Sequence, residues 1–240
     1  MAHAEVSRTM LEMSALVGGD RIRRPRGLEV SAAETIVEPQ SVAELSELVR
    51  KCEGDRITIA PIGACRTLSL IRPRPVELGV SLCRITRIEA YDCADMTVAV
   101  GAGRSLEALN AQLVENRQQL PFDPPGPKQT TIGSLIGAAH AGPMRLHQGL
   151  VRDLIIGIEF VGHGGRVVHG GGRVVKNVAG YDLMRLMIGS FGTLGIVTQA
   201  AFKVLPLLTG ETIAVASFDS FEESWAAAKR LNDLVNASHL

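Results

Sequence analysis

Glycine density constrains the fold of this 240-residue chain more than any other feature of its sequence. Sixteen of the 25 glycines fall between positions 126 and 195, and they are densest in GRVVHGGGRVVKNVAGYDLMRLMIGSFGTLGI, residues 165 to 196. Glycine is used where the backbone takes a positive φ or passes very close to another group. The pattern therefore favours tight turns packed around a large, flat, phosphate-bearing ligand.

The composition argues against several classes of function. With 46% hydrophobic residues the chain can bury a core, and its 25 basic and 25 acidic residues leave no excess charge to attract nucleic acid. No segment approaches the roughly 18 apolar residues that span a bilayer, and the N-terminus lacks the pattern of a signal peptide. We therefore expect a cytoplasmic protein that reaches a membrane only through partners.

The thiols and imidazoles do not suggest a metal site. The four cysteines are Cys52, Cys65, Cys83 and Cys93, and they have neither CxxC spacing nor the density of a disulfide scaffold. The six histidines include no HExxH pair. We expect mostly buried thiols and no bound metal.

Strand-like and helix-like segments alternate along the chain and predict an α+β fold. Strands are expected at 35–39, 56–62, 82–91, 96–103, 154–162, 167–171, 195–207 and 212–218, with the pairs 82–91/96–103 and 154–162/167–171 adjacent in space. Helices are expected at 41–52, 105–119, 130–142 and 220–238, capped by Ser41, Ser105 and, in the last, Ser220. Lone Trp225 on the last helix is expected in a core.

Three regions follow from this pattern. Residues 1–34 form an N-terminal extension, residues 35–208 the main domain, and residues 209–240 the truncated start of a further domain, with the boundary near 206–210. One strand and one helix cannot bury a core of their own, so the last region needs more chain or a partner.

Two segments are candidate anion sites. PIGACRT, residues 61 to 67, follows a strand and can present backbone N–H groups to a pyrophosphate, with Arg66 and Thr67 adding contacts. It matches neither the dinucleotide fingerprint nor the P-loop, and an ordinary strand-to-turn junction is the alternative. The second, residues 127–139, places Gly133 at a helix start with free N–H groups; the alternative is a small-residue helix packed on a sheet.

Further polar residues allow two interpretations. Arg152 and Asp153 precede a strand, where they either line a ligand or pair on the surface. Lys176, Asn177, Tyr181 and Asp182 bracket a glycine, and turn hydrogen bonds are the simpler account because no nucleophile and base stand together. No catalytic residue can be assigned.

Taken in order, these motifs resemble the FAD-binding domain of the vanillyl-alcohol oxidase type flavoproteins, the PCMH-type fold. The matching motifs are EPQSVAELSELVR, PIGACRT, TIGSLIGAAHAGP, GLVRDLIIG and KNVAGYDLMRLMIGSFGTLGI. The resemblance covers residues 35 to 208 and implies two α+β subdomains followed by the start of a cap domain. Within the family the segment is most similar to glycolate oxidase flavin subunits, and among these to the second, E-type subunit, because Phe191 stands where the catalytic subunit has a glutamate.

The resemblance implies noncovalent FAD and a set of contact residues. The backbone of residues 62–67 would hold the pyrophosphate; Gly133, Ser134 and the His140 region would approach the flavin and ribityl chain; and Ile196 would contact the adenine. The full set of implied cofactor-binding residues is Pro61, Ile62, Gly63, Ala64, Cys65, Arg66, Thr67, Thr131, Gly133, Ser134, His140, Gly149, Val151, Asp153, Gly195 and Ile196.

Two hypotheses about function follow from the resemblance. In the first, the chain is the FAD-binding subunit of a glycolate oxidase-like complex that oxidises a small 2-hydroxy acid, with a catalytic flavin subunit and an iron–sulfur subunit as partners. In the second, it is a noncatalytic structural subunit that binds FAD weakly, because Ala64 and Cys65 replace glycines of the family's pyrophosphate loop. A fragment of a D-lactate dehydrogenase is a third possibility.

Overall fold

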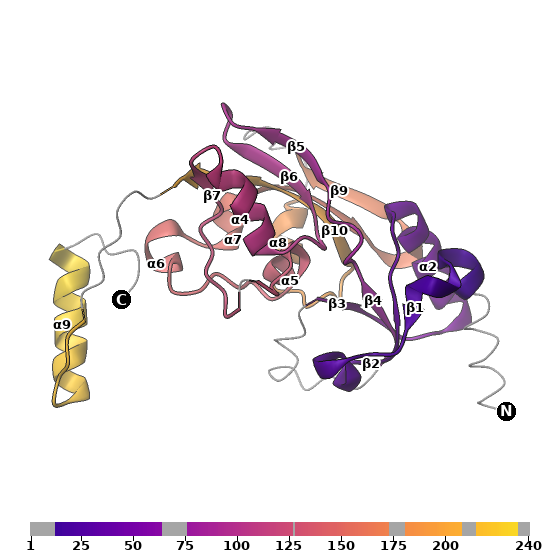
Figure 1. The fold of residues 1–240 in the computed structure, drawn as a ribbon, viewed down its shortest axis with the longest axis horizontal. Helices are drawn as coiled ribbons and strands as arrows, with labels where there is room; N and C mark the ends of the chain where they lie inside the picture. The colour runs from indigo at the N-terminus through magenta and orange to yellow at the C-terminus, as the bar shows by residue number, and fades with distance from the viewer. Residues whose placement is uncertain (1–12, 64–75, 127, 173–180, 208–214, 235–240) are drawn as a thin grey trace.

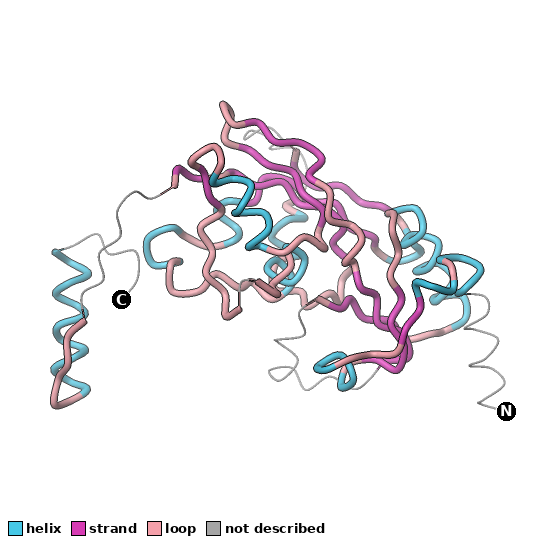
Figure 2. Tube along the Cα trace, in the orientation of Figure 1, coloured by secondary structure: helices cyan, strands magenta, loops and turns pink. Residues whose placement is uncertain are grey.

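The computed structural model describes residues 13–63, 76–126, 128–172, 181–207 and 215–234. It contains two main sheets with helices packed around them, so the predicted α+β class is confirmed (Figure 1). Figure 2 shows the strands concentrated in the middle of the molecule and the helix at 221–234 standing apart from them. No helix among the described residues is long and apolar enough to span a membrane.

The first sheet has the strand order β1-β2-β4-β3. Its strands are β1 (Ile22–Arg23), β2 (Ala33–Val37), β3 (Ile59–Ile62) and β4 (Val76–Ser81), and α2 (Val42–Asp55) connects β2 to β3. Strands β2, β4 and β3 are parallel, while β1 runs antiparallel to β2. The short 3-10 helices η1 (Gly19–Arg21) and η2 (Gly27–Ser31) flank β1.

Helix α2 forms where the sequence predicts it, and for the predicted reason. The Ser41 hydroxyl accepts a hydrogen bond from the Glu44 N–H at 3.1 Å, which caps the first turn. Apolar residues recur at helical spacing, and Leu45, Leu48 and Cys52 are all fully buried. The helix ends at Arg56, whose φ of 59° is left-handed. One face of α2 therefore packs in the core.

The second sheet is antiparallel throughout, with the order β5-β6-β10-β8-β9. Its strands are β5 (Ile88–Asp92), β6 (Thr97–Gly101), β8 (Ile155–Val161), β9 (Val167–Gly171) and β10 (Ile196–Lys203), and the 3-10 turn η3 (His163–Gly165) joins β8 to β9. Both predicted strand pairs, β5/β6 and β8/β9, are confirmed. A two-stranded sheet pairs β7 (Gln118–Gln119) with β11 (Leu205–Pro206).

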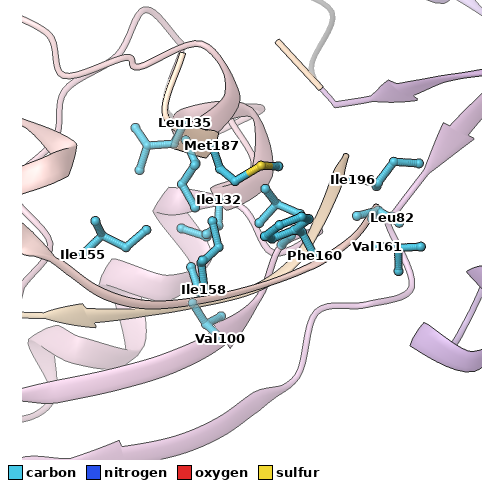
Figure 3. Close-up of a cluster of buried hydrophobic side chains, with 14 of the residues drawn as sticks. Leu82, Val100, Ile132, Leu135, Ile155, Ile158, Phe160, Val161, Met187 and Ile196 are labelled. Atoms are coloured by element: carbon cyan, nitrogen blue, oxygen red, sulfur yellow. The ribbon is translucent and has the colours of Figure 1, made fainter. Parts of the chain in front are cut away.

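Short helices accompany the second sheet. They are α4 (Leu106–Val114), α5 (Ile132–Gly137), α6 (Arg145–Gln148), α7 (Val151–Leu154) and α8 (Leu183–Met187). Ser105 caps α4 as predicted, since its hydroxyl accepts from the Ala108 N–H at 3.2 Å. Figure 3 shows the apolar side chains of α5, α8, β6 and β8 packed together, among them Ile132, Leu135, Met187, Ile158 and Phe160.

Residues ahead of β2 are part of the folded body. Residues 13–17 are helical, and Met13 and Val17 are fully buried in the main core. Arg23 bridges two carboxylates, 2.7 Å from both Glu29 and Glu38. The hydrogen bond from Arg23 lowers the pKa of Glu29. Burial acts to raise the pKa of Glu38, but the hydrogen bond and positive charge of Arg23 outweigh burial, so the pKa of Glu38 is lowered as well.

Several local predictions were wrong. The helices expected at 105–119 and 130–142 are shorter, and residues 215–218 of the expected strand at 212–218 lie in no strand. Helix α9 (Phe221–Leu234) forms and is capped by Ser220, but Trp225 is 58% exposed and stacks on Phe221, with ring centroids 6.4 Å apart. The spacing of apolar residues along a helix shows that one face is apolar, but that face is buried only where another element packs on it.

The thiols differ from the prediction of mostly buried cysteines. Cys52 is buried, and burial raises its pKa to about 12, whereas Cys83 and Cys93 are exposed. Cys65 lies outside the described residues. Within the described part of the chain, no three His, Cys, Asp or Glu side chains gather as metal ligands.

Candidate cofactor site

The end of β3 is in close contact with the glycine turn that precedes β10. Gly192 has a φ of 76°, and a Cβ added there would overlap Cγ of Pro61 and lie 2.8 Å from its Cδ. Both the left-handed backbone and the missing side chain are therefore needed at this position. The contact joins a residue of the first sheet to a turn of the second.

The same end of β3 also contacts the start of α5. A Cβ on Gly63 would lie 3.0 Å from Cβ of Ser134 and 3.1 Å from Oγ1 of Thr131. The described part of the predicted pyrophosphate segment at 61–67, Pro61–Gly63, thus lies against the start of α5 at Thr131–Ser134. The structure brings these two sequence motifs together, although they are about 70 positions apart in the chain.

Two backbone hydrogen bonds join the end of α5 to the glycine turn. The Gly189 N–H donates to the Ile136 carbonyl at 3.0 Å, and the Phe191 N–H donates to the Gly137 carbonyl at 2.8 Å. Phe191 takes a φ of 53°, a conformation that residues other than glycine rarely adopt. Three glycine-rich motifs, at 61–63, 131–137 and 189–195, therefore form one continuous surface.

The helix start of α5 corrects one prediction. The N–H groups expected to be free for an anion are all engaged within the protein. Ile132 and Gly133 donate to the carbonyls of Arg104 and Ala102 at 2.9 and 2.8 Å, and the Ser134 N–H donates to the Thr131 hydroxyl at 3.2 Å. Gly133 instead allows close packing, since its added Cβ would be 3.3 Å from the Ala102 carbonyl oxygen.

The predicted residues at 149–153 form a capped turn. Gly149 has a φ of 85°, and the Asp153 carboxylate accepts a hydrogen bond from the Leu150 N–H at 2.8 Å, which caps α7. Arg152 lies 3.7 Å from Asp153, the surface pairing that the sequence left open. Val151 is only 1% exposed, so it is a core side chain.

The remaining predicted residues have mixed surroundings. Ile196 is 4% exposed and packs beside Val161 and Leu82 (Figure 3), so only its backbone can approach a ligand. The His140 N–H donates to the Leu135 carbonyl at 3.0 Å, closing the end of α5. Ala64, Cys65, Arg66 and Thr67 lie outside the described residues, as do Lys176 and Asn177.

The described part of this surface carries hydroxyl groups, exposed backbone and apolar side chains. Phe191 and Leu194 are 40% and 50% exposed beside the glycine turn. Asp182 accepts from the Arg185 N–H at 3.1 Å and caps α8, which confirms its turn role, and Tyr181 is 95% exposed. Such a surface can hold a flat, uncharged ring, and it presents no paired acid and base among the described residues.

Gly189 and Gly192 are contact residues that the sequence did not predict. Both lie in the glycine-dense segment and both take a φ of 76°. Both stand in the pattern GSFGTLG, but Gly189 contacts the Ile136 carbonyl and Gly192 contacts Pro61, which come from distant segments. Local sequence alone therefore could not connect them.

Comparison with known families gives a direct match. The family model described as an FAD binding domain matches residues 33–171. Among solved structures, an alkyldihydroxyacetonephosphate synthase superposes with a TM-score of 0.74 over 96% of this chain and 49% of its own, at 20% identity. At that identity the likeness concerns the fold alone.

Curated relatives include glycolate oxidase subunits and D-lactate dehydrogenases. Glycolate oxidase subunit GlcD of Bacillus subtilis is 33% identical over 211 residues, 86% of this chain and 44% of the relative. Glycolate oxidase subunit GlcE of Escherichia coli is 40% identical over 117 residues, 48% of this chain and 33% of the relative. A mitochondrial D-lactate dehydrogenase of Arabidopsis thaliana is 31% identical over 198 residues, 81% of this chain and 34% of the relative. This chain spans less than half the length of each.

The residues of this surface fit FAD. The cofactor is long and flat, and the surface at 61–63, 131–137 and 189–195 brings three backbone segments together beside exposed Phe191. A side chain at Gly63 or Gly192 would push these segments apart. From this surface and the family match over more than half of its length, the chain belongs to the FAD-binding family of PCMH-type flavoproteins, with FAD as its cofactor.

Proposed function

We propose that this chain is the FAD-binding subunit of an oxidoreductase of the glycolate oxidase type, which oxidises a small 2-hydroxy acid. The observation that carries the proposal is the meeting of three glycine-rich motifs at the end of β3, where Pro61 and Gly63 contact Gly192 and Ser134. Relatives named as glycolate oxidase subunits and D-lactate dehydrogenases support the substrate class.

The chain's own residues would bind and orient the cofactor. The backbone from Pro61 onward would hold the pyrophosphate, the surface at 131–140 would face the flavin and ribityl chain, and the backbone at 195–196 would face the adenine. Residues 149, 151 and 153 would lie along the cofactor through the turn that Asp153 caps. When bound, noncovalent FAD supplies the hydride acceptor for a 2-hydroxy acid.

Substrate binding would involve residues outside the FAD-binding domain. Residues 1–34 would be the N-terminal extension, residues 35–208 the FAD-binding domain, and residues 209–240 the start of a substrate domain. A catalytic flavin subunit and an iron–sulfur subunit would complete the assembly, which lies in the cytoplasm and meets a membrane only through these partners. The exposed aromatic pair of α9, Phe221 and Trp225, supports placing this segment outside the FAD-binding domain.

The first experiment is a visible spectrum of the purified chain, before and after incubation with FAD and desalting, followed by heat denaturation. The proposal predicts flavin absorption that moves to the supernatant on heating. A titration then compares Gly63→Ala with Gly54→Ala, because a Cβ at Gly54 meets nothing within 4 Å. We expect about tenfold weaker FAD binding for Gly63→Ala and no change for the control.

A chain that binds no FAD would instead favour the noncatalytic subunit, for which the sequence departures at Ala64 and Cys65 are the specific observation. Changing both to glycine would then restore binding if the loop has lost that role. For a chain that does bind FAD, anaerobic bleaching of the flavin band by glycolate or by D-lactate, in the presence of the partner subunits, distinguishes the two substrate classes.

A further inference from the structure

Helix α2 has a second, polar face, and this face contacts the second sheet's hairpin. Ser46, Arg50 and Glu53 recur at i, i+4 and i+7, so they lie along one stripe of the helix. The apolar residues of α2 pack in the core, whereas this stripe meets the η3 turn between β8 and β9. The stripe thus connects the first sheet's helix to the second sheet's hairpin.

The contact is built from directed hydrogen bonds. The Ser46 hydroxyl, itself buried, donates to the Gly165 carbonyl. The Glu53 carboxylate accepts from the Gly164 N–H at 2.7 Å with one oxygen, and its other oxygen lies 2.8 Å from Nδ1 of His163. We call these contacts, between Ser46 and Glu53 on α2 and residues 163–165, the α2–turn joint.

The turn's two left-handed glycines have different reasons to be glycine. Gly164 and Gly165 have φ values of 67° and 68°. A Cβ on Gly165 would overlap the Ser46 carbonyl oxygen and lie 3.3 Å from Cβ of Arg50, whereas a Cβ on Gly164 would meet nothing within 4 Å. Gly165 is therefore required by the approach of α2, and Gly164 only by the turn itself.

The joint is linked to the cofactor site through both partners. On one side, α2 leads directly into β3, a strand of four residues that ends at the site with Pro61 and Ile62. On the other, Val161 pairs with Ile196 just before η3, and a Cβ on Gly195 would lie 3.5 Å from Cα of Gly162. The joint and the Pro61–Gly192 contact therefore close a ring of contacts between the two sheets.

We propose that the α2–turn joint aligns the segments that meet at the FAD site, Pro61–Gly63 on one side and Thr131–Ser134 with Gly192 on the other. Ser46 and Glu53 are positioning residues in this proposal, since they act through β3 and the hairpin. Loosening the joint would let the end of β3 shift relative to Gly192. This inference rests on the proposed cofactor contacts of those segments.

The test compares Gly165→Ala with Gly164→Ala in the full chain. The two changes add the same methyl group at nearly the same φ, so they share the backbone strain and differ in the clash with Ser46. We expect about tenfold weaker FAD binding for Gly165→Ala than for Gly164→Ala. Both measurements are made well below the unfolding temperature of each variant, where a mere loss of stability leaves the dissociation constant unchanged.

Amide hydrogen exchange supplies a readout that does not need FAD. With the joint loosened, the N–H groups of Gly189 and Phe191 at the cofactor site should exchange faster in Gly165→Ala than in Gly164→Ala. If Gly165→Ala does not fold, Glu53→Gln replaces it, with exposed Glu47→Gln on the same helix as the control. The pair is then expected to show the same difference in binding and exchange.

The outcomes separate this inference from the proposed function. Equal FAD affinity and equal exchange in the two members of a pair would overturn the positioning role. A wild-type chain that binds no FAD would count against the proposed function, and the exchange comparison would still decide whether the joint controls the geometry at Gly189–Gly192.

Discussion

Besides the core that the two sheets share, two further contacts join them, and these differ in character. At the end of β3, Pro61 and Gly63 pack against Gly192 and Ser134 through van der Waals contact. At the α2–turn joint, side chains of Ser46 and Glu53 make directed hydrogen bonds to backbone. Hydrogen bonds fix orientation, whereas glycine packing fixes only how closely two backbones approach. Packing therefore shapes the proposed cofactor surface at the end of β3, whereas hydrogen bonds orient the helix that precedes this strand.

The largest effect is expected from Gly192→Ala, which breaks the glycine contact. The φ of 76° adds about 1–2 kcal/mol of strain, and the methyl group also overlaps the Pro61 ring. We expect a loss of about 3 kcal/mol in the free energy of unfolding, measured by urea denaturation. Gly164→Ala, which has the strain without the overlap, should lose about 1 kcal/mol. Equal losses of unfolding free energy in the two variants would show that Pro61 can move away from an added methyl group without destabilising the fold.

A smaller effect is expected from Ser46→Ala, which breaks one bond of the α2–turn joint. Removing the hydroxyl leaves the Gly165 carbonyl without its buried donor, which should lower the free energy of unfolding by about 2 kcal/mol. Urea denaturation measures this loss. The control is Ser31→Ala, whose hydroxyl donates to the Leu28 carbonyl at the surface and should change stability by less than about 0.5 kcal/mol. Indistinguishable values would mean that the joint is not a buried polar contact.

The smallest effect is expected from Arg23→Gln, which disturbs neither contact. Arg23 holds Glu29 and lowers its pKa below 4.5, so the pair stabilises the fold above about pH 4.5 and loses this contribution as pH falls through the lowered pKa. We expect a loss of about 1 kcal/mol at pH 7 that shrinks below pH 4.5, with FAD affinity unchanged.

Thermal unfolding from pH 7 to pH 3 measures this dependence, and exposed Arg24→Gln is the control. A loss that stays constant across that range would contradict the assignment to Glu29. A change in FAD affinity would mean that the first sheet influences the site by a route other than the α2–turn joint.

Local signals in the sequence predicted the elements that depend on neighbouring residues. Ser41, Ser105 and Ser220 cap helices as expected, and the β8–β9 hairpin turns at residues 163–165 as the glycines predicted. The motif order also led to the family. These predictions succeeded because caps and turns are decided within a few residues.

Contacts between distant segments could not be predicted in this way. The carbonyls of Ala102 and Arg104 occupy the N–H groups at the start of α5, and nothing near Gly133 in the sequence shows that they approach. The partner of the polar stripe of α2 lies over 110 positions away, so the residues around the stripe do not reveal the contact. Trp225 was expected in a core, since spacing reveals an apolar face but not what covers it.

The buried pair Met13 and Val17 extends the folded unit toward the N-terminus. The family match starts at residue 33, yet these two side chains are fully buried in the core shared by both sheets. A protein shortened at its N-terminus to residue 33 would lose these two core side chains and β1, the antiparallel neighbour of β2. The folded core therefore begins ahead of the segment that the family model matches.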